Sequence, residues 1–215
     1  MRAIGSDMVD GDHSQRRAQM EQAGGVLERS GVMSHTGHIN FSTRIDDRRM
    51  MLTSSGLIAD LRADALAVVD LDGNIEEGDL NASTREIVGM HATVYRLRAD
   101  VGAVLHTHSP HVTAFALANR PLPARYEALL RRGQDRVVPV APWAPRGSQE
   151  FFDGIAGALA AGEGTMALLL GNHGVLAFGS SAITAVKLMI VLEEAAEAEL
   201  RAAAIGGAKD LHSHG

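Results

Sequence analysis

Short apolar segments alternate along the chain with longer segments of helical periodicity, and this alternation is the strongest constraint on the fold. The apolar segments predict strands, at Arg49–Leu52, Ala65–Leu71, Val101–His108, Arg136–Val140, Met166–Leu170 and Val175–Phe178. The segments between them predict helices, at Ser14–Ser30, Arg85–Arg98, Ser109–Leu117, Ser148–Ala161 and Ser181–Ala204. Strands that alternate with helices pack in layers, so we expect an α/β domain.

The chain of 215 residues has no internal repeat or low-complexity linker, so we expect one domain over residues 14–205. Flexible tails are predicted for residues 1–13 and 206–215, with Ser14 as the N-cap of the first helix and Gly31 just past its end. Hydrophobic residues make up 46% of the chain but aromatic residues only 4%, so the core must consist mainly of Ala, Val, Leu, Ile and Met.

Composition excludes several classes of function. A net charge of -6 argues against a nucleic-acid surface. The absence of cysteine rules out disulfides and thiolate zinc sites. The N-terminal residues lack the apolar stretch of a signal peptide, and no apolar run approaches the ~20 residues that span a bilayer. We therefore expect a cytoplasmic protein with no nucleic-acid or membrane partner.

Three histidines follow apolar strands. His106 and His108 come at the end of the segment Val101–His108 and, two residues apart on a strand, face the same side. His173 follows the next apolar run, between Asn172 and Gly174. Converging neutral imidazoles form an open site for a divalent transition metal. The alternative is that these are ordinary strand histidines with hydrogen-bonded rings.

Several polar positions are candidates for catalysis or substrate binding. Glu86 lies at a helix start and is a candidate general acid/base, or a metal ligand while the site holds no substrate. The alternative is that it is simply an acidic residue in a first helical turn, where the helix dipole favours negative charge. The remaining candidates for substrate binding lie in polar loops: His38 and Asn40, Ser55 and Gly56, and Ser83 and Thr84. Ser83 and Thr84 come at a helix start, where free N–H groups suit an anion. The alternative for each of these residues is an ordinary role in helix capping or in a turn.

Together these motifs resemble the class II aldolase/adducin family over about Ser14–Ala204. The resemblance is carried by Met90–Arg96 with Asp100–Ser109, by Gly171–Gly174 and by Thr53–Gly56. It implies a single three-layer α/β/α domain with a mostly antiparallel central sheet, assembled as a homotetramer. It also implies that His106, His108 and His173 bind the metal, and Glu86 most nearly matches the family's acidic catalytic residue.

Two loops depart from the family pattern. The usual Ser-Gly-Asn is replaced by His38-Ile39-Asn40, which keeps only the asparagine. The usual Ser-Ser-Glu appears as Ser83-Thr84-Arg85-Glu86, with Glu86 five residues before His91 instead of four. These loops hold substrate phosphate in the family's aldolases, so His38 and Arg146 become candidates for binding an anion.

The resemblance implies a metal-dependent lyase of the aldolase or decarboxylase type. It would act on a small hydroxy-carbonyl or sugar-acid substrate through a metal-stabilised enediolate. Zn²⁺ is the first choice of metal, with Fe²⁺, Mn²⁺ and Co²⁺ open. Two alternatives remain: a non-heme iron oxygenase acting on an oxo- or hydroxy-acid at the same histidines, and a non-catalytic, adducin-like binding module.

Overall fold

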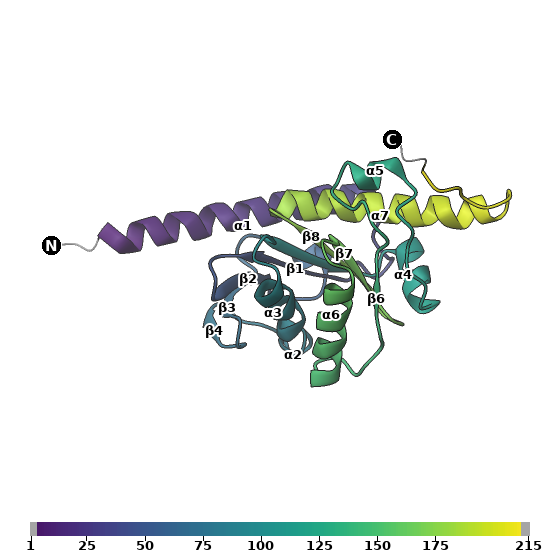
Figure 1. Ribbon diagram of the computed structural model, residues 1–215. Coiled ribbons are helices and arrows are strands. Elements are labelled where there is room, and N and C mark those ends of the chain that lie inside the picture. Colours follow the sequence, from purple (N-terminus) through teal and green to yellow (C-terminus); the bar gives the residue numbers. More distant parts are fainter. Residues whose placement is uncertain (1–3, 212–215) are drawn as a thin grey trace.

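The computed structural model describes residues 4–211, which form one eight-stranded sheet covered by helices on both faces (Figure 1). The strands are β1 (Ile39–Arg44), β2 (Arg49–Thr53), β3 (Leu66–Asp70), β4 (Ile75–Glu77), β5 (Ala103–Thr107), β6 (Val140–Ala141), β7 (Ala167–Leu170) and β8 (Gly174–Gly179). Their order across the sheet is β4-β3-β2-β1-β5-β8-β7-β6. Neighbours are antiparallel, apart from the parallel pair β6 and β7, so the predicted three-layer fold is confirmed.

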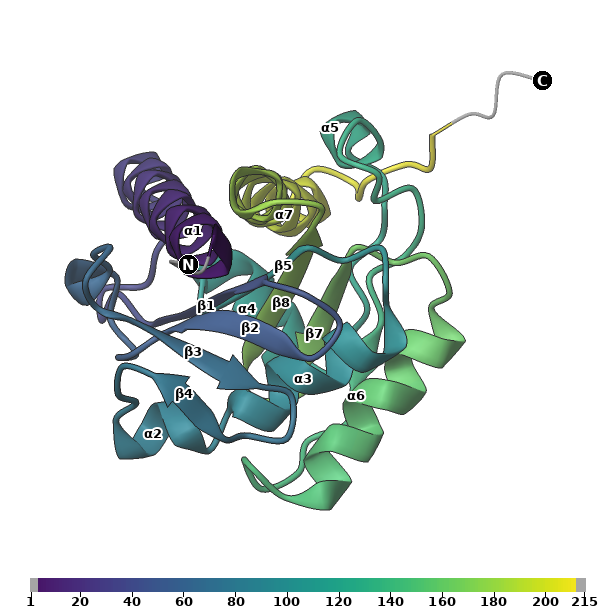
Figure 2. The same cartoon turned by 90° about the vertical axis from the view of Figure 1, so that its left-hand side faces the viewer.

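The helices form the two outer layers. They are α1 (Ile4–Ser30), α2 (Ala82–Arg85), α3 (Val88–Leu97), α4 (Pro110–Leu117), α5 (Glu127–Leu130), α6 (Gln149–Ala161) and α7 (Ala182–Ala203), with a short 3₁₀ helix, η1, at Ile58–Asp60. The long helices α1 and α7 lie side by side on one face, while α3 and α6 pack together on the other (Figure 2). Along residues 4–211, no helix has the length and apolar content needed to cross a bilayer.

Strand alternation divides the core into two halves and decides where β5 sends its side chains. Ala103 and Leu105 belong to the cluster on the side of α1 and α7, whereas Val104 belongs to the cluster on the side of α3 and α6. Because side chains alternate along a strand, His106 lies on the α3/α6 face. Its partner across the β1–β5 ladder is Asn40, on the same face.

The N-terminal boundary differs from the prediction. Helix α1 already begins at Ile4, so residues 4–13 are helical and Ser14 is an interior residue instead of an N-cap. No proline precedes Pro110, and an interior serine costs a helix only a few tenths of a kcal/mol, about 0.5 at most, so nothing stops the helix from starting earlier. The predicted end is confirmed, since Gly31 has a positive φ of 75°. Residues 1–3 and 212–215 of the predicted tails lie outside the described range.

The segment around Asn40 was expected to be a polar loop, but it forms β1 in the middle of the sheet. Its polar side is satisfied by helix α3 instead of by water. The hydroxyl of Ser42 lies 2.7 Å from Nδ1 of His91 and 2.9 Å from the Tyr95 hydroxyl. These partners are distant in sequence, so the local pattern around Asn40 did not indicate a half-buried strand. The strand predicted at Arg136–Val140 is shorter in the structure, where β6 spans only Val140–Ala141.

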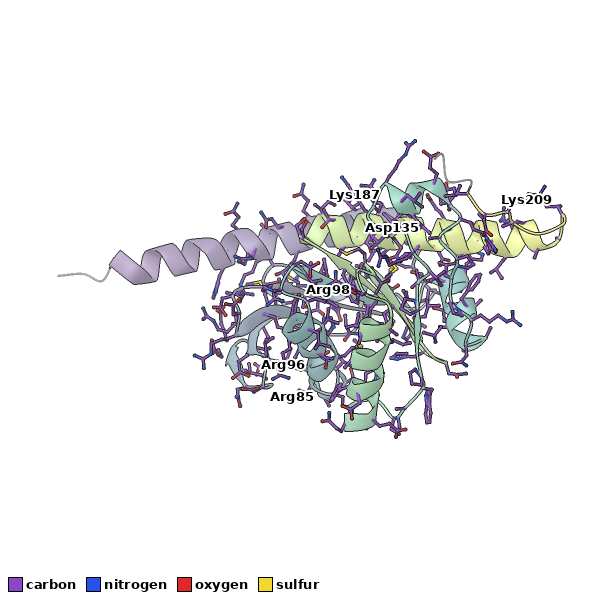
Figure 3. All side chains as sticks on the ribbon, in the orientation of Figure 1. Arg85, Arg96, Arg98, Asp135, Lys187 and Lys209 are labelled. Atoms are coloured by element: carbon purple, nitrogen blue, oxygen red, sulfur yellow. The ribbon has the colours of Figure 1, made fainter. Side chains whose placement is uncertain are left out.

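Two arginines fasten the C-terminal end of α3 to the rest of the sheet, and both are labelled in Figure 3. Arg96 donates to the carbonyl of Leu71, which lies between β3 and β4. Arg98 donates to the carbonyl of Thr165, just before β7. Arg98 is largely buried and Arg96 is exposed, so the Arg98 bond contributes most to holding the C-terminal end of α3.

Burial of His91 predicts an acid-sensitive contribution to stability. Its imidazole is fully buried, which lowers its pKa from 6.5 to about 3. The unfolded chain therefore binds the proton more tightly, and stability present above pH 6.5 is lost as the pH falls toward 3. Replacing His91 by Gln, which stays neutral, should reduce the loss of unfolding free energy between pH 7 and pH 5 by about 2 kcal/mol.

Urea unfolding of both proteins at the two pH values measures this difference. The other histidines titrate in both proteins, so their contributions cancel. An identical pH dependence in the two proteins would contradict a neutral, buried His91.

Candidate metal centre

Four histidine rings meet at one end of the sheet. His106 is on β5 and His108 directly follows that strand, while His173 lies in the turn between β7 and β8. His38 precedes β1 and forms an isolated bridge with Leu57. The structure thus brings together the three histidines that the sequence singled out as ligands and adds a fourth.

The rings are in mutual contact. Ring centroids are 4.8 Å apart for His106 and His173, and 5.0 Å apart for His108 and each of these two rings. His38 stacks on His108 with the centroids 4.3 Å apart. The closest set of ligand nitrogens belongs to His38, His106 and His108, which lie within 4.8 Å of one another. This set differs from the predicted trio, which contains His173 instead of His38.

A backbone carbonyl fixes the tautomer of His106. Nδ1 of His106 lies 3.0 Å from the carbonyl oxygen of Val175 on β8. Because a carbonyl only accepts, Nδ1 carries the proton and Nε2 keeps its lone pair. That Nε2 lies 3.2 Å from Nε2 of His108, close to the edge of about 3.3 Å that a tetrahedral zinc site with bonds of about 2.0–2.1 Å requires. The carbonyl is the kind of outer partner that orients metal-binding histidines.

Gly174 gives the rings their room. A Cβ there would lie 2.6 Å from the carbonyl oxygen of Thr107, 2.8 Å from Cδ2 of His108 and 3.1 Å from Cε1 of His106. Asn172, in the same turn, has a positive φ of 56°. The turn therefore combines an unusual backbone with a position where only glycine fits.

Burial keeps these rings uncharged. It lowers the pKa of His108 and of His173 to about 4 and that of His106 well below its usual range. The pKa of His38 is also lowered, by burial and by the charge of Arg146. Metal ligation requires neutral imidazole, so the cluster is already in the protonation state that binds an ion at neutral pH.

Glu86 is paired with Arg146, and the guanidinium of Arg146 lies between this carboxylate and the histidines in its electrostatic effect. Its carboxylate accepts from Arg146, with Oε2 3.0 Å from Nε and 2.9 Å from a terminal guanidinium nitrogen. The same guanidinium is near enough to lower the pKa of His108 and of His173. Glu86 follows α2 and precedes α3, so the one-residue shift in sequence falls at a break between two helices.

The predicted substrate-binding residues divide into two groups. Asn40 and Gly56 lie against His38: Nδ2 of Asn40 is 3.1 Å from its Nε2, and a Cβ on Gly56 would lie 3.3 Å from its Cε1. Ser55 instead donates its hydroxyl to Asp60.

Ser83 and Thr84 serve the short helix α2. Ser83 donates to the side chain of Asn81, which caps the helix by accepting from the Thr84 amide. The Thr84 hydroxyl is buried and has no hydrogen-bond partner among the described residues.

A cavity of about 230 Å³ borders His173. Arg146, a predicted anion contact, lines it together with Trp143 and Phe151, which the sequence did not single out. The ring of Phe151 has its centroid 6.4 Å from that of His173, while Trp143 is 61% exposed. A signal was present, because the chain's single tryptophan stands in a proline-rich loop next to Arg146.

Comparison with known proteins decides the family. Residues 18–200 match the family model described as the Class II Aldolase and Adducin N-terminal domain. The chain belongs to the class II aldolase and adducin family.

Named relatives show what kind of enzymes resemble this chain. A 5-methylthioribulose-1-phosphate/5-deoxyribulose-1-phosphate aldolase from Rhodospirillum rubrum is 36% identical over 160 residues, 74% of this chain and 68% of the relative. A 3-oxo-tetronate 4-phosphate decarboxylase from Haemophilus influenzae is 28% identical over 86% of this chain and 87% of its own. A solved L-fuculose 1-phosphate aldolase superposes with a TM-score of 0.80 at 27% identity, covering 93% of this chain and 91% of its own. The chain is therefore a class II aldolase-like lyase.

Replacing Gly174 by Ala should weaken metal binding. The added methyl group displaces the rings of His106 and His108, and disturbing the support of ligands costs about 10–100-fold in metal affinity. Gly157→Ala is the matched control, since a Cβ there meets nothing within 4 Å. Competition for Zn²⁺ with a chromophoric chelator measures both variants. Equal Zn²⁺ affinities would show that the rings do not depend on the missing Cβ.

Proposed function

We propose that this protein is a metal-dependent lyase, of the aldolase or decarboxylase type, acting on a small hydroxy-carbonyl or sugar-acid substrate. His106, His108 and His173 hold the divalent metal, with Zn²⁺ as the first choice. The observation that carries the proposal is the buried set of neutral imidazoles, with the Nε2 atoms of His106 and His108 3.2 Å apart. Relatives named as an aldolase and a decarboxylase support the same class of chemistry.

The residues present fit such an ion. Three imidazole nitrogens from the strand end and the turn leave coordination positions for substrate oxygens. When bound, a divalent metal supplies Lewis acidity toward the carbonyl and hydroxyl oxygens of the substrate. The cavity lined by Trp143 and Phe151 borders His173 and gives a substrate access to it.

Arg146 and Glu86 provide the remaining chemistry. The guanidinium of Arg146 binds a phosphate or carboxylate of the substrate, because its planar donors match both groups. An anion that engages Arg146 competes with the Glu86 carboxylate, which then becomes free to take up or deliver a proton as the carbon–carbon bond breaks. The substrate-binding residues of this proposal are His38, Asn40 on β1, Ser55 and Gly56 after β2, and Ser83 and Thr84 on α2.

We also propose that the enzyme is cytoplasmic and that it assembles as a homotetramer, the assembly being what the family resemblance implies. Size-exclusion chromatography with light scattering tests the assembly directly.

The experiment that tests the function combines metal analysis with a substrate screen. Untagged protein should contain stoichiometric zinc and should cleave or decarboxylate at least one phosphorylated or free sugar acid. His106→Ala should lose both the metal and turnover, whereas His35→Ala, which removes an exposed histidine outside the cluster, should lose neither. Retention of metal and full turnover in His106→Ala would overturn the ligand assignment. Oxygen consumption with an oxo-acid under iron alone would favour the oxygenase instead.

Glu86→Gln should separate metal binding from proton transfer. The amide keeps the size of the side chain but cannot exchange a proton, so kcat should fall by about 10²–10⁴-fold while zinc content is unchanged. Glu127→Gln is the control, since Glu127 is likewise an exposed carboxylate paired with an arginine, Arg131. Steady-state kinetics on the substrate from the screen gives the comparison. A kcat within about twofold of the parent enzyme would remove Glu86 from the proton-transfer step.

A further inference from the structure

The fourth histidine has no role in the metal trio, yet its ring is part of the same cluster. His38 stacks on His108 with an angle of 25° between the ring planes and meets His106 edge-on, with the centroids 5.5 Å apart. One ligand nitrogen from each of these three residues lies within 4.8 Å of the others. A metal bond of about 2.0–2.1 Å to each nitrogen needs separations near 3.3 Å, so the three nitrogens would have to move closer together to share one ion.

The surroundings of His38 distinguish its two ring nitrogens. The Nδ1 edge rests on the backbone at Gly56, where a Cβ would lie 3.4 Å from Nδ1 and 3.3 Å from Cε1. The Nε2 edge faces Asn40, whose amide Nδ2 is 3.1 Å away. Because the amide nitrogen donates, Nε2 is the unprotonated nitrogen and has the lone pair that a metal needs.

The backbone holds this arrangement in place from both sides. His38 bridges Leu57, and the Ile39 amide donates to the Gly56 carbonyl at 3.0 Å. Asn40, two residues on, pairs with His106 across the β1–β5 ladder. The ring of His38 is therefore carried by the strand next to the one that carries His106.

The other candidate for a fourth ligand is engaged elsewhere. Both hydrogen-bonding contacts to Oε2 of Glu86 come from the guanidinium of Arg146. Ligation by Glu86 would have to break this charge-assisted pair, whereas ligation by His38 exchanges a single neutral contact with Asn40.

We propose that His38 is a fourth protein ligand of the metal centre, in the place that a carboxylate from Glu86 would otherwise take. This inference rests on the proposed metal centre and adds a residue to it. An all-imidazole set replaces a hard oxygen by nitrogen, which disfavours Mn²⁺ relative to Zn²⁺ and Co²⁺. Ligation by His38 would release the Asn40 amide from its present contact with Nε2 of that ring.

Metal binding by the full-length protein, measured apart from turnover, tests this assignment. His38→Ala should raise the dissociation constant for Zn²⁺ by at least about tenfold, while Glu86→Gln should leave it within about twofold. Co²⁺-loaded His38→Ala should also show altered visible d–d bands, because a nitrogen ligand has been lost. His35→Ala controls for the loss of a nearby histidine, and urea unfolding of the metal-free proteins checks that the His38 variant is folded.

The outcomes separate this inference from the proposed function. Unchanged Zn²⁺ affinity and Co²⁺ spectrum in His38→Ala, together with metal loss in His106→Ala, would overturn the fourth ligand and leave the centre standing. A loss of affinity in Glu86→Gln would assign the position to the carboxylate. Metal retained at full affinity in His106→Ala would overturn the centre itself.

Discussion

In the antiparallel ladder between β5 and β8, Thr107 lies opposite Val175, and the Val175 carbonyl accepts the proton on Nδ1 of His106. Everything at the site depends on this register. A slip of one residue would turn His106 to the α1/α7 face and put Leu105 or Thr107 in its place. Gly174, which precedes Val175 on β8 and pairs with Leu170 on β7, leaves the space that the rings of His106 and His108 need.

A second polar layer stabilises the strand beside this ladder. Ser42 on β1 joins His91 and Tyr95 of α3 in one buried network. Arg44, at the end of β1, donates to the carbonyls of Tyr95 and Val101 and lies over the Tyr95 ring, 4.7 Å from its centroid. Buried polar groups are costly unless they are satisfied, and these contacts let a strand with a polar face lie in the middle of the sheet.

Local sequence pattern was enough to predict the strand–turn–histidine motifs, since His106, His108 and His173 each follow an apolar run. It also predicted the helices whose caps are local, such as α6, where Ser148 accepts from the Phe151 amide. It did not predict β1, because the partners of Ser42 are 49 and 53 residues away. The pairing of Glu86 with Arg146 spans 60 residues and was equally out of reach. His38 was singled out for binding an anion, since only the folded sheet shows its ring stacked on His108.

The histidine cluster joins segments that lie far apart in the chain. His38 comes before the first strand and His173 from the turn between the last two, with β5 between them in the sheet. The rings do not come together in an unfolded or partly folded chain. Closing the loops between them costs conformational entropy, and only the pairing of the central strands offsets this cost. An ion that binds the finished cluster and not the disordered chain therefore shifts the folding equilibrium by mass action, and the supply of metal in the cell sets how much of the polypeptide stays native.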